Sequence, residues 1–280
     1  MTMASVGDFI GELEDAGELV RISHPVKARL ELCEISDRVM KQPGGGKALV
    51  FENVILDDGR RSRYPVAINL FGSMKRMAMA LGVTDLDEIG ARITQLMDLK
   101  VPEGIAGKLS MLPRLMEVAK FPPRVRSGPA RSQEIVLRGD EIDLREIPII
   151  TCWPEDGGPF ITLPMVISKD PKRGIRNVGM YRVQYDSPNT LKMHWQRHKV
   201  GAAHWREMAE RKERMPVCIV IGADPPSIYS ASAPLPPTVD EFLFAGFLRK
   251  QPLSLVRAIT CELEVPAEAD FVFEGYIDPS

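Results

Sequence analysis

The sequence predicts a mixed α+β protein, with an N-terminal α/β domain over residues 1–118 and a strand-rich second domain over residues 119–280. The first third has mostly helical apolar spacing, with two brief strand-like runs, whereas short strands dominate after about residue 120. A chain of 280 residues is also long enough for two ordinary domains of about 100 to 150 residues. Many short strands with few helices suggest a barrel or sandwich-like second domain.

Helical spacing of apolar residues and brief β-branched runs define the elements expected in the first part. In chain order these are a helix through Phe9, Ile10 and Leu13, a helix through Leu30, Cys33, Ile35 and Val39, strands Ala48–Phe51 and Pro65–Leu70, and helices Ser73–Leu81 and Asp85–Leu96. A Pro- and Gly-rich connector over Pro102–Pro129 follows and is expected to hold a helix from Lys108 to Val118.

The second part is predicted to be built from short strands with two helices. The expected strands are Glu134–Leu137, Ile161–Ser168, Asn177–Tyr185, Leu191–His198, Val217–Ile221 and Leu253–Ile259, and the helices are Ala202–Lys212 and Val239–Arg249. The turn signals DPKRG and DSPN separate several of these strands.

Composition excludes several classes of protein. With 44% hydrophobic and 26% charged residues, the chain resembles an average globular protein. Because 36 basic residues face 38 acidic ones, no nucleic-acid or anionic-membrane surface is expected over the whole molecule, and any anion site must be local. A signal peptide needs an uninterrupted apolar core, and Asp8, Glu12 and Asp15 interrupt the N-terminal segment where it would lie. No apolar stretch is long enough for a membrane-spanning helix.

The four cysteines, Cys33, Cys152, Cys218 and Cys261, lie far apart and form no CxxC motif. A zinc knuckle and a dense disulfide framework are therefore not supported. Reduced thiols in a cytoplasmic protein fit this spacing better.

The commonest catalytic signatures are absent: the sequence contains no GxxxxGK[ST], GxGxxG, HExxH or GxSxG. Three consecutive glycines, Gly44–Gly46, stand between a predicted helix and a predicted strand. Their backbone N–H groups could cradle a phosphate, but a helix stop followed by a plain loop is favoured, because no Lys-Ser/Thr follows.

Polar residues are dense in the strands of the second part. Read at period two, one face of Leu191–His198 carries His194, Gln196 and His198, and the other face carries Trp195, Arg197 and Lys199. Such a face could build a site, although solvated or hydrogen-bonded structural residues explain the same pattern.

Glu241 allows two interpretations. Thr238-Val-Asp-Glu241 matches a T-x-x-E capping box at the start of an apolar helix. Spacing alone favours this capping box. A carboxylate in a first helical turn could equally face a cation, and with an Asn oxygen and a His nitrogen it would suit Mn²⁺ or Mg²⁺, but the residue spacing does not by itself identify such a site.

Six motifs in order resemble the UbiD family of prenylated-flavin-dependent decarboxylases, in particular its ubiquinone-pathway branch, the 3-polyprenyl-4-hydroxybenzoate decarboxylases. They are TCWPEDGGPFIT, RNVGMYR, MHWQRHK, IGADPPSIYSASAPLP, EFLFAGFLR and LEVPAEADFVFEGYI, and the resemblance runs from about Phe9 to Ser280. It implies that the second domain is a split β-barrel of flavin-reductase type that binds prenylated FMN, and that the family's C-terminal domain is absent from this chain.

The resemblance also implies site residues, by position. It assigns Asn177, His198 and Glu241 as ligands of a Mn²⁺ that bridges to the flavin phosphate; Met180, Tyr181, Arg182, His194, Trp195, Gln196 and Lys199 as cofactor contacts; and Ser232, Ala233 and Pro234 as the loop beside the cofactor and a second, monovalent cation (K⁺). Arg182 is the one catalytic residue assigned. The HWQRHKV segment departs from the RWLSHRG of close relatives.

The implied activity is the reversible, non-oxidative decarboxylation of an aromatic, 4-hydroxybenzoate-type, or unsaturated carboxylic acid. The family's Glu and its Asp or Glu proton donor belong to an EGPFGD-type segment after EGYI, where this sequence reads Tyr276-Ile-Asp-Pro-Ser280. The 280 residues alone are therefore expected to be inactive. A non-catalytic subunit that binds flavin phosphate and metal and needs a partner chain is the alternative.

The resemblance further implies a flavin prenyltransferase as supplier of the cofactor and a homo-oligomer in the full-length form. The expected localisation is cytoplasmic. If the substrate is polyprenylated, the enzyme would meet it at the surface of the inner membrane and make peripheral contact there.

Overall fold

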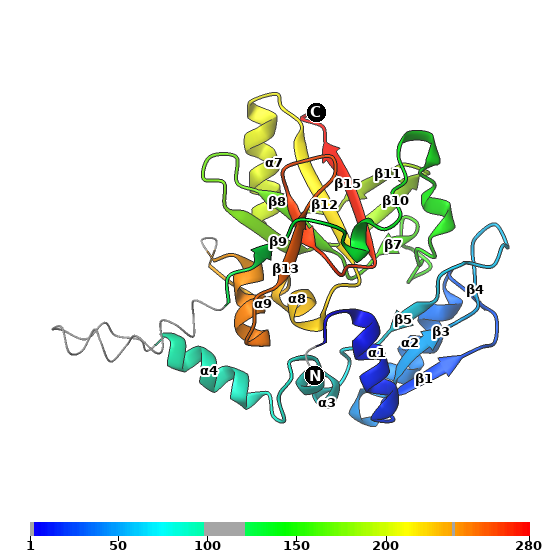
Figure 1. Cartoon of the computed structure of the whole chain (residues 1–280). Helices are drawn as coiled ribbons and strands as arrows, with labels where there is room; N and C mark the ends of the chain where they lie inside the picture. The colour runs from blue at the N-terminus through cyan, green and yellow to red at the C-terminus, as the bar shows by residue number, and fades with distance from the viewer. Residues whose placement is uncertain (1–2, 98–120, 237–238) are drawn as a thin grey trace, which may run out of the picture.

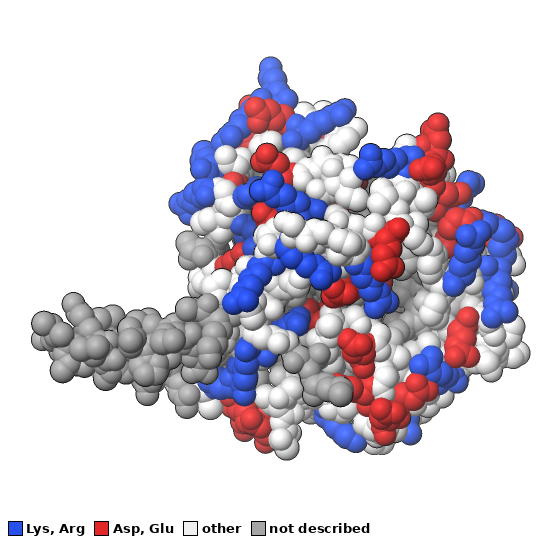
Figure 2. Space-filling model, viewed as in Figure 1, with Lys and Arg blue, Asp and Glu red and all other residues white. Residues whose placement is uncertain are grey.

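The computed structural model describes residues 3–97, 121–236 and 239–280. It has the predicted mixed α+β architecture. In Figure 1 the early strands and helices form one end of the molecule, and the strands after residue 160 gather in a second body. Lys and Arg are interspersed with Asp and Glu on the face in Figure 2, which agrees with the near-balance of charge in the sequence.

The N-terminal part is a small sheet with helices against it. Its sheet has the order β1 (Leu19–Ile22), β3 (Ala48–Phe51), β5 (Val66–Ile68), and β2 (Val26–Lys27) pairs with β4 (Val54–Ile55). Helix α1 (Val6–Asp15) begins at Ser5, whose side chain and that of Asp8 cap each other's backbone N–H groups. Phe9 and Leu13 of α1 are fully buried because they share the face that meets the sheet.

The elements predicted for this part are largely confirmed. Besides α1, β3 and β5, the structure has α2 (Glu31–Met40), α3 (Met74–Ala80) and α4 (Asp87–Met97) where helices were expected. The short strands β1, β2 and β4 were not predicted. The helix expected at Lys108–Val118 lies outside the described residues.

The glycine loop is a structural turn that buried side chains hold from within. The Arg76 guanidinium is fully buried and donates to the Gly46 carbonyl at 2.5 Å, and Asn69 Nδ2 donates to the Gly45 carbonyl at 2.9 Å. A Cβ on Gly46 would stand 2.0 Å from the Val39 carbonyl oxygen, so no larger residue fits there. This arrangement favours the loop interpretation over the phosphate cradle.

The second part contains three open sheets. The largest has the order β15 (Phe271–Ile277), β12 (Met215–Ile221), β8 (Met165–Lys169), β9 (Arg176–Met180); a second has β11 (Thr190–Met193), β10 (Val183–Ser187), β7 (Phe160–Ile161); a third has β14 (Glu264–Pro266), β13 (Ser254–Arg257), β6 (Arg124–Val125). Among the described strands no sheet closes into a barrel, so the split-barrel detail stays a prediction.

Three helices accompany these sheets. Helix α7 (Val200–Glu210) lies beside β8, β9 and β12, and α8 (Pro225–Ser230) packs against α9 (Glu241–Arg249). Only α7 and α9 were predicted. The start of α8 nevertheless carries a helix signal, because Asp224 caps it and Pro225 occupies the first helical position.

Four strand predictions need correction. Residues 134–137 form no strand; they follow the short 3₁₀ helix η2 (Arg131–Gln133), and Ile135 is 82% exposed, because no neighbouring strand pairs with this segment. The strand predicted at 161–168 is interrupted before Met165, and the one at 177–185 is interrupted at Tyr181 and Arg182. The strand predicted at 191–198 ends at Met193.

No helix in the described ranges is long and apolar enough to cross a membrane.

The Arg76 contacts yield a stability prediction. Arg76→Met should lower the free energy of unfolding by roughly 2–4 kcal/mol, because the Gly45 and Gly46 carbonyls and the Glu18 carboxylate lose a buried donor. Lys75→Met is the matched control: this exposed side chain pairs with the same Glu18, and its loss should cost less than about 1 kcal/mol. Urea denaturation measures both, and equal losses would contradict this role of Arg76.

Candidate functional site

The candidate site begins at the free edge of β9. Its inner edge pairs with β8, and on the outer side the Val178 N–H donates to Glu241 Oε2 at 2.9 Å. Two residues on, the Met180 N–H donates to the Ala231 carbonyl at 3.0 Å. The start of α9 and the loop after α8 therefore both contact the outer edge of β9, two residues apart.

The capping-box interpretation of Glu241 is wrong. Helix α9 starts at Glu241 with Asp240 as its N-cap, and the Asp240 side chain accepts from the Phe242 N–H at 2.8 Å. Glu241 is thus the first helical residue rather than the third, and its carboxylate accepts the Val178 N–H of β9. Thr238 lies outside the described residues.

The Glu241 carboxylate is half-buried and forms no ion pair with a Lys or Arg of the described residues. Burial raises its pKa from 4.5 to about 7, whereas the Val178 N–H and the more distant Arg176 act in the opposite direction. Arg176 already pairs with Asp240 at 2.6 Å and Glu264 at 2.8 Å. Within the described part of the chain no ion pair forms to Glu241.

Asn177 lies next to the Val178 amide that binds Glu241. Its side chain is 6% exposed, and its Nδ2 has no hydrogen-bond partner among the described residues. Asn177 pairs in register with Ser168 of β8, whose hydroxyl lies 3.0 Å from Nδ1 of the buried His204 on α7. The sequence reasoning missed Ser168 and His204, which no motif marks.

His198 is exposed and lies in the turn between β11 and α7. The predicted common strand face of His194, Gln196 and His198 is wrong, because β11 ends before all three. The described residues show no contact from His198 to Asn177 or Glu241, and no group of three His, Cys, Asp or Glu side chains that could hold a metal. Two of the three predicted ligands thus lie together, and the third is not joined to them.

Arg182 is positioned by an ion pair and by an aromatic ring. Its two Nη atoms donate to the two carboxylate oxygens of Asp156 at 3.1 and 2.9 Å, and its guanidinium lies 3.9 Å from the centre of the Phe160 ring. This ion pair holds the pKa of Asp156 below its usual range. His194 meets the same Phe160 ring edge to face at 4.9 Å and bonds to Gln184 at 2.9 Å.

Asp156 was not predicted as a site residue. It stands inside the quoted TCWPEDGGPFIT motif, so an acid in a glycine-rich turn was the available signal.

The remaining predicted cofactor contacts lie around Tyr181. Burial raises the pKa of Tyr181, and its ring meets Trp195 edge to face at 6.2 Å. The Trp195 Nε1–H is buried without a partner among the described residues. Lys199 caps α7 through its backbone, and Gln196 accepts the Lys199 N–H at 3.0 Å.

The loop predicted beside the cofactor follows α8. Ser232 donates its hydroxyl to the Tyr229 carbonyl at 2.8 Å, and Ala233 N–H donates to the Ser230 carbonyl at 3.2 Å. The Ala231 carbonyl accepts the Met180 N–H. The loop that follows it therefore starts beside the edge of β9; it comprises Ser232, Ala233 and Pro234. This loop and the start of α9 are therefore brought together, as the assignment of both to one site requires.

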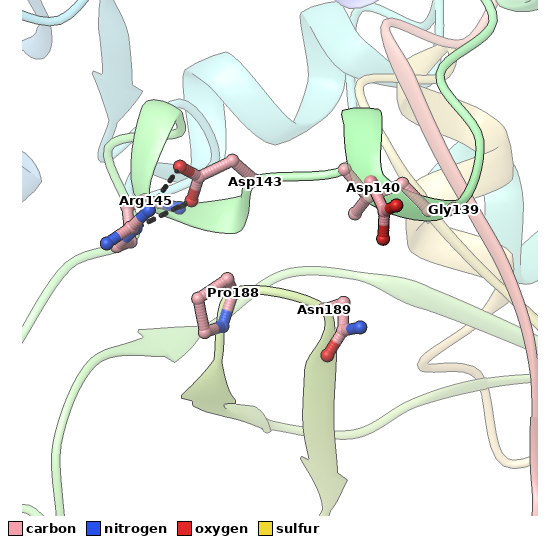
Figure 3. A pocket seen from close by; sticks show the side chains of 7 residues that line it. Gly139, Asp140, Asp143, Arg145, Pro188 and Asn189 are labelled. Carbon is pink, nitrogen blue, oxygen red and sulfur yellow. Dashed lines mark hydrogen bonds and ion pairs between the residues drawn. The ribbon is translucent and has the colours of Figure 1, made fainter.

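A pocket of about 340 Å³ lies elsewhere, between the short helices η3 (Gly139–Glu141) and η4 (Leu144–Glu146) and the β10–β11 turn (Figure 3). Asp143 already binds both the Nε and Nη2 atoms of Arg145 at 2.8 Å. None of the predicted site residues lines it, and its one guanidinium is neutralised.

Comparison with known proteins gives matches along nearly the whole chain. Residues 123–280 match the 3-octaprenyl-4-hydroxybenzoate carboxy-lyase Rift-related domain of UbiD, and residues 10–93 match the corresponding N-terminal domain. A curated protein of Aquifex aeolicus (strain VF5), described as uncharacterized, is 46% identical over 272 residues, covering 97% of this chain and 54% of that protein.

Two solved structures of the UbiD-class enzyme HmfF from Pelotomaculum thermopropionicum share the fold. The complex with FMN is 27% identical with a TM-score of 0.76, covering 98% of this chain and 55% of that one. The evolved dimeric form in complex with prFMN is 26% identical with a TM-score of 0.77, covering 99% and 58%. The chain spans about half the length of the relatives that it matches, and the match of both family domains shows that it belongs to the UbiD family.

Proposed function

We propose that this chain binds prenylated FMN and Mn²⁺ and forms the cofactor-binding part of a reversible, non-oxidative decarboxylase for aromatic or unsaturated carboxylic acids. The observation that carries the proposal is the position of the Glu241 carboxylate, which has a raised pKa and accepts the Val178 N–H beside the buried Asn177, on the strand that leads to Arg182. Family membership and the FMN- and prFMN-bound forms of HmfF support it.

The donor set fits a hard divalent cation. The half-buried Glu241 carboxylate, with its raised pKa, and the side-chain oxygen of the buried Asn177 are ligand types that suit Mn²⁺ or Mg²⁺ better than a thiolate-binding metal. Asn177 and Glu241 would hold the ion, with His198 as third ligand and Lys199 adding charge for the flavin phosphate. Ser232, Ala233 and Pro234 would line the monovalent cation site. The unpartnered Trp195 N–H offers a donor for the cofactor.

The chain's own residues would bind and orient the substrate. Prenylated FMN, when bound, supplies the electron sink for the electron pair that remains when CO₂ leaves. Arg182, permanently charged and fixed by Asp156 and Phe160, would hold the substrate carboxylate over the cofactor. Met180, Tyr181, His194 and Gln196 would shape the cofactor wall.

Return of a proton to carbon needs a carboxylic acid that the resemblance assigns to residues after Ile277. We propose that the residues described above bind the cofactor and orient the substrate, and that a carboxylic acid of an EGPFGD-type segment returns the proton. A flavin prenyltransferase would supply the cofactor, and the assembled enzyme would be a homo-oligomer.

The proposal treats residues 1–118 and 119–280 as two domains. The two family models match residues 10–93 and 123–280, one on each side of this boundary, which supports the division.

The metal site predicts a selective loss of Mn²⁺ affinity. Glu241→Gln and Asn177→Ala should each weaken Mn²⁺ binding in the presence of FMN by at least about tenfold, because each removes an oxygen ligand or its charge. Isothermal titration calorimetry measures this, and Glu134→Gln, an exposed carboxylate, is the control. Unchanged affinity in Glu241→Gln would overturn the metal assignment.

The raised pKa of Glu241 predicts a pH-dependent stability of the metal-free protein. Because the folded state binds this proton more tightly than the unfolded state, stability contributed by the protonated carboxyl is lost as pH rises from 4.5 to about 7, by roughly 3 kcal/mol. Denaturation midpoints between pH 4.5 and 8 should therefore fall less in Glu241→Gln than in the native chain. Parallel curves for the two proteins would refute the assignment.

The function itself is tested by reconstitution. The chain mixed with prenylated FMN and Mn²⁺ should show a bound-flavin spectrum, and CO₂ release from aromatic acids should be detected when a carboxylic acid of an EGPFGD-type segment is present. Failure to bind any flavin overturns the proposed function, whereas flavin binding without CO₂ release in the presence of such an acid refutes only the decarboxylase assignment.

A further inference from the structure

The four cysteines lie far apart in sequence but form two close pairs in the fold. Cys218 Sγ lies 3.8 Å from Cys261 Sγ, and Cys33 lies against Cys152. All four are free thiols. Only the Cys33–Cys152 pair lies next to a predicted catalytic group.

The backbone brings Cys33 and Cys152 together. The Leu30 N–H donates to the Thr151 carbonyl at 2.9 Å, and the Thr151 N–H donates to the Ala28 carbonyl at 3.3 Å. These bonds fasten the start of α2, whose first turn carries Cys33, to the residue before Cys152. Both thiols pack on the same apolar cluster, which includes Ile150, and both are partly exposed.

Cys152 faces charged groups on its other side. It lies beside the Arg182–Asp156 ion pair, and the Arg182 guanidinium interacts with its sulfur. The Cys33 thiol above all, and Arg182 after it, lower the pKa of Cys152 to about 7, while burial acts against them. The contact with Cys152 and burial raise the pKa of Cys33. Because the Arg182 guanidinium contacts Cys152, we expect the thiolate at Cys152 and the proton at Cys33.

We propose that Cys152 and Cys33 form a thiol–disulfide exchange site beside Arg182, which takes small-molecule disulfides such as glutathione disulfide. The Cys152 thiolate attacks one sulfur of the disulfide and releases a glutathione thiolate, which takes a proton from solvent. Cys33 then loses its proton and attacks Cys152 Sγ, releasing the second glutathione. Two protein thiols are oxidised and one glutathione disulfide is reduced to two thiols.

The reaction changes the surroundings of Arg182. Reduced Cys152 offers the guanidinium a second anionic acceptor besides Asp156, and the disulfide removes it. The Cys33–Cys152 disulfide also joins α2 covalently to the loop that carries Asp156. The inference depends on these contacts and is independent of the proposed cofactor and substrate.

The first test is alkylation by iodoacetamide at pH 7, with each cysteine followed by peptide mass spectrometry. Cys152 should react at least about tenfold faster than Cys33 and Cys218. Arg182→Gln and Cys33→Ala should each slow Cys152 at pH 7, Asp156→Asn should accelerate it, and the differences should vanish near pH 9.5, where the thiolate dominates in every variant.

Cys261 is the internal control. Its pKa is also lowered to about 7, but by Cys218 and the Leu263 backbone rather than by an arginine. Its alkylation rate should therefore be unchanged by Arg182→Gln and Asp156→Asn. Equal responses of Cys152 and Cys261, or a Cys152 rate no faster than that of Cys33, would overturn the proposal.

The second test is oxidation by glutathione disulfide, followed by digestion without reductant. A peptide pair linked through Cys33 and Cys152 should form with release of two glutathione thiols. Cys33→Ala should stop at a glutathione adduct on Cys152. Adducts on Cys33 alone, or no linked peptide in the native chain, would refute the exchange site.

Discussion

The site depends on the outer edge of β9, where two backbone N–H groups need acceptors. A buried N–H without an acceptor costs free energy, so the fold favours an arrangement in which other segments supply acceptors along this edge. Val178 takes the Glu241 carboxylate and Met180 takes the Ala231 carbonyl. Because Asn177 and Arg182 lie on the same short stretch of chain, satisfying the strand edge also assembles the candidate site.

A second buried contact holds together the two elements that supply the acceptors for this edge. Asp224 caps α8 and pairs with Arg249 at the end of α9 at 2.7 Å, and both side chains are almost fully buried. Removing either partner would leave an uncompensated buried charge. The pair therefore links the helix that precedes the Ala231 loop to the helix that begins with Glu241, and any shift of one moves the other.

Sequence periodicity predicted the elements whose apolar face is buried and missed what depends on contacts distant in sequence. Helices α1 and α2 and strand β3 followed directly from spacing. Residues 134–137 have strand composition but no strand to pair with, and such a segment stays exposed. Asp240 replaced Thr238 as the cap of α9, since both residue types cap well and tertiary contacts decide between them. The Asp156 contact could not be read from spacing, because it joins separate elements.

The ion pair of Arg182 with Asp156 limits the positive charge that the proposed site could offer to a ligand. This nearly neutral chain would have to hold a doubly charged phosphate together with a substrate carboxylate. Asp156 takes both Nη atoms of Arg182, so this pair carries no net charge toward a ligand. A carboxylate that approaches Arg182 must share the guanidinium with Asp156, which orients the ligand at some expense in affinity. The charge that a phosphate needs must then come from elsewhere, and the uncompensated Glu241 adds a negative group rather than a positive one. In the proposed site, a divalent cation held by Glu241 would supply the positive charge that a phosphate needs, which a single lysine could do only in part.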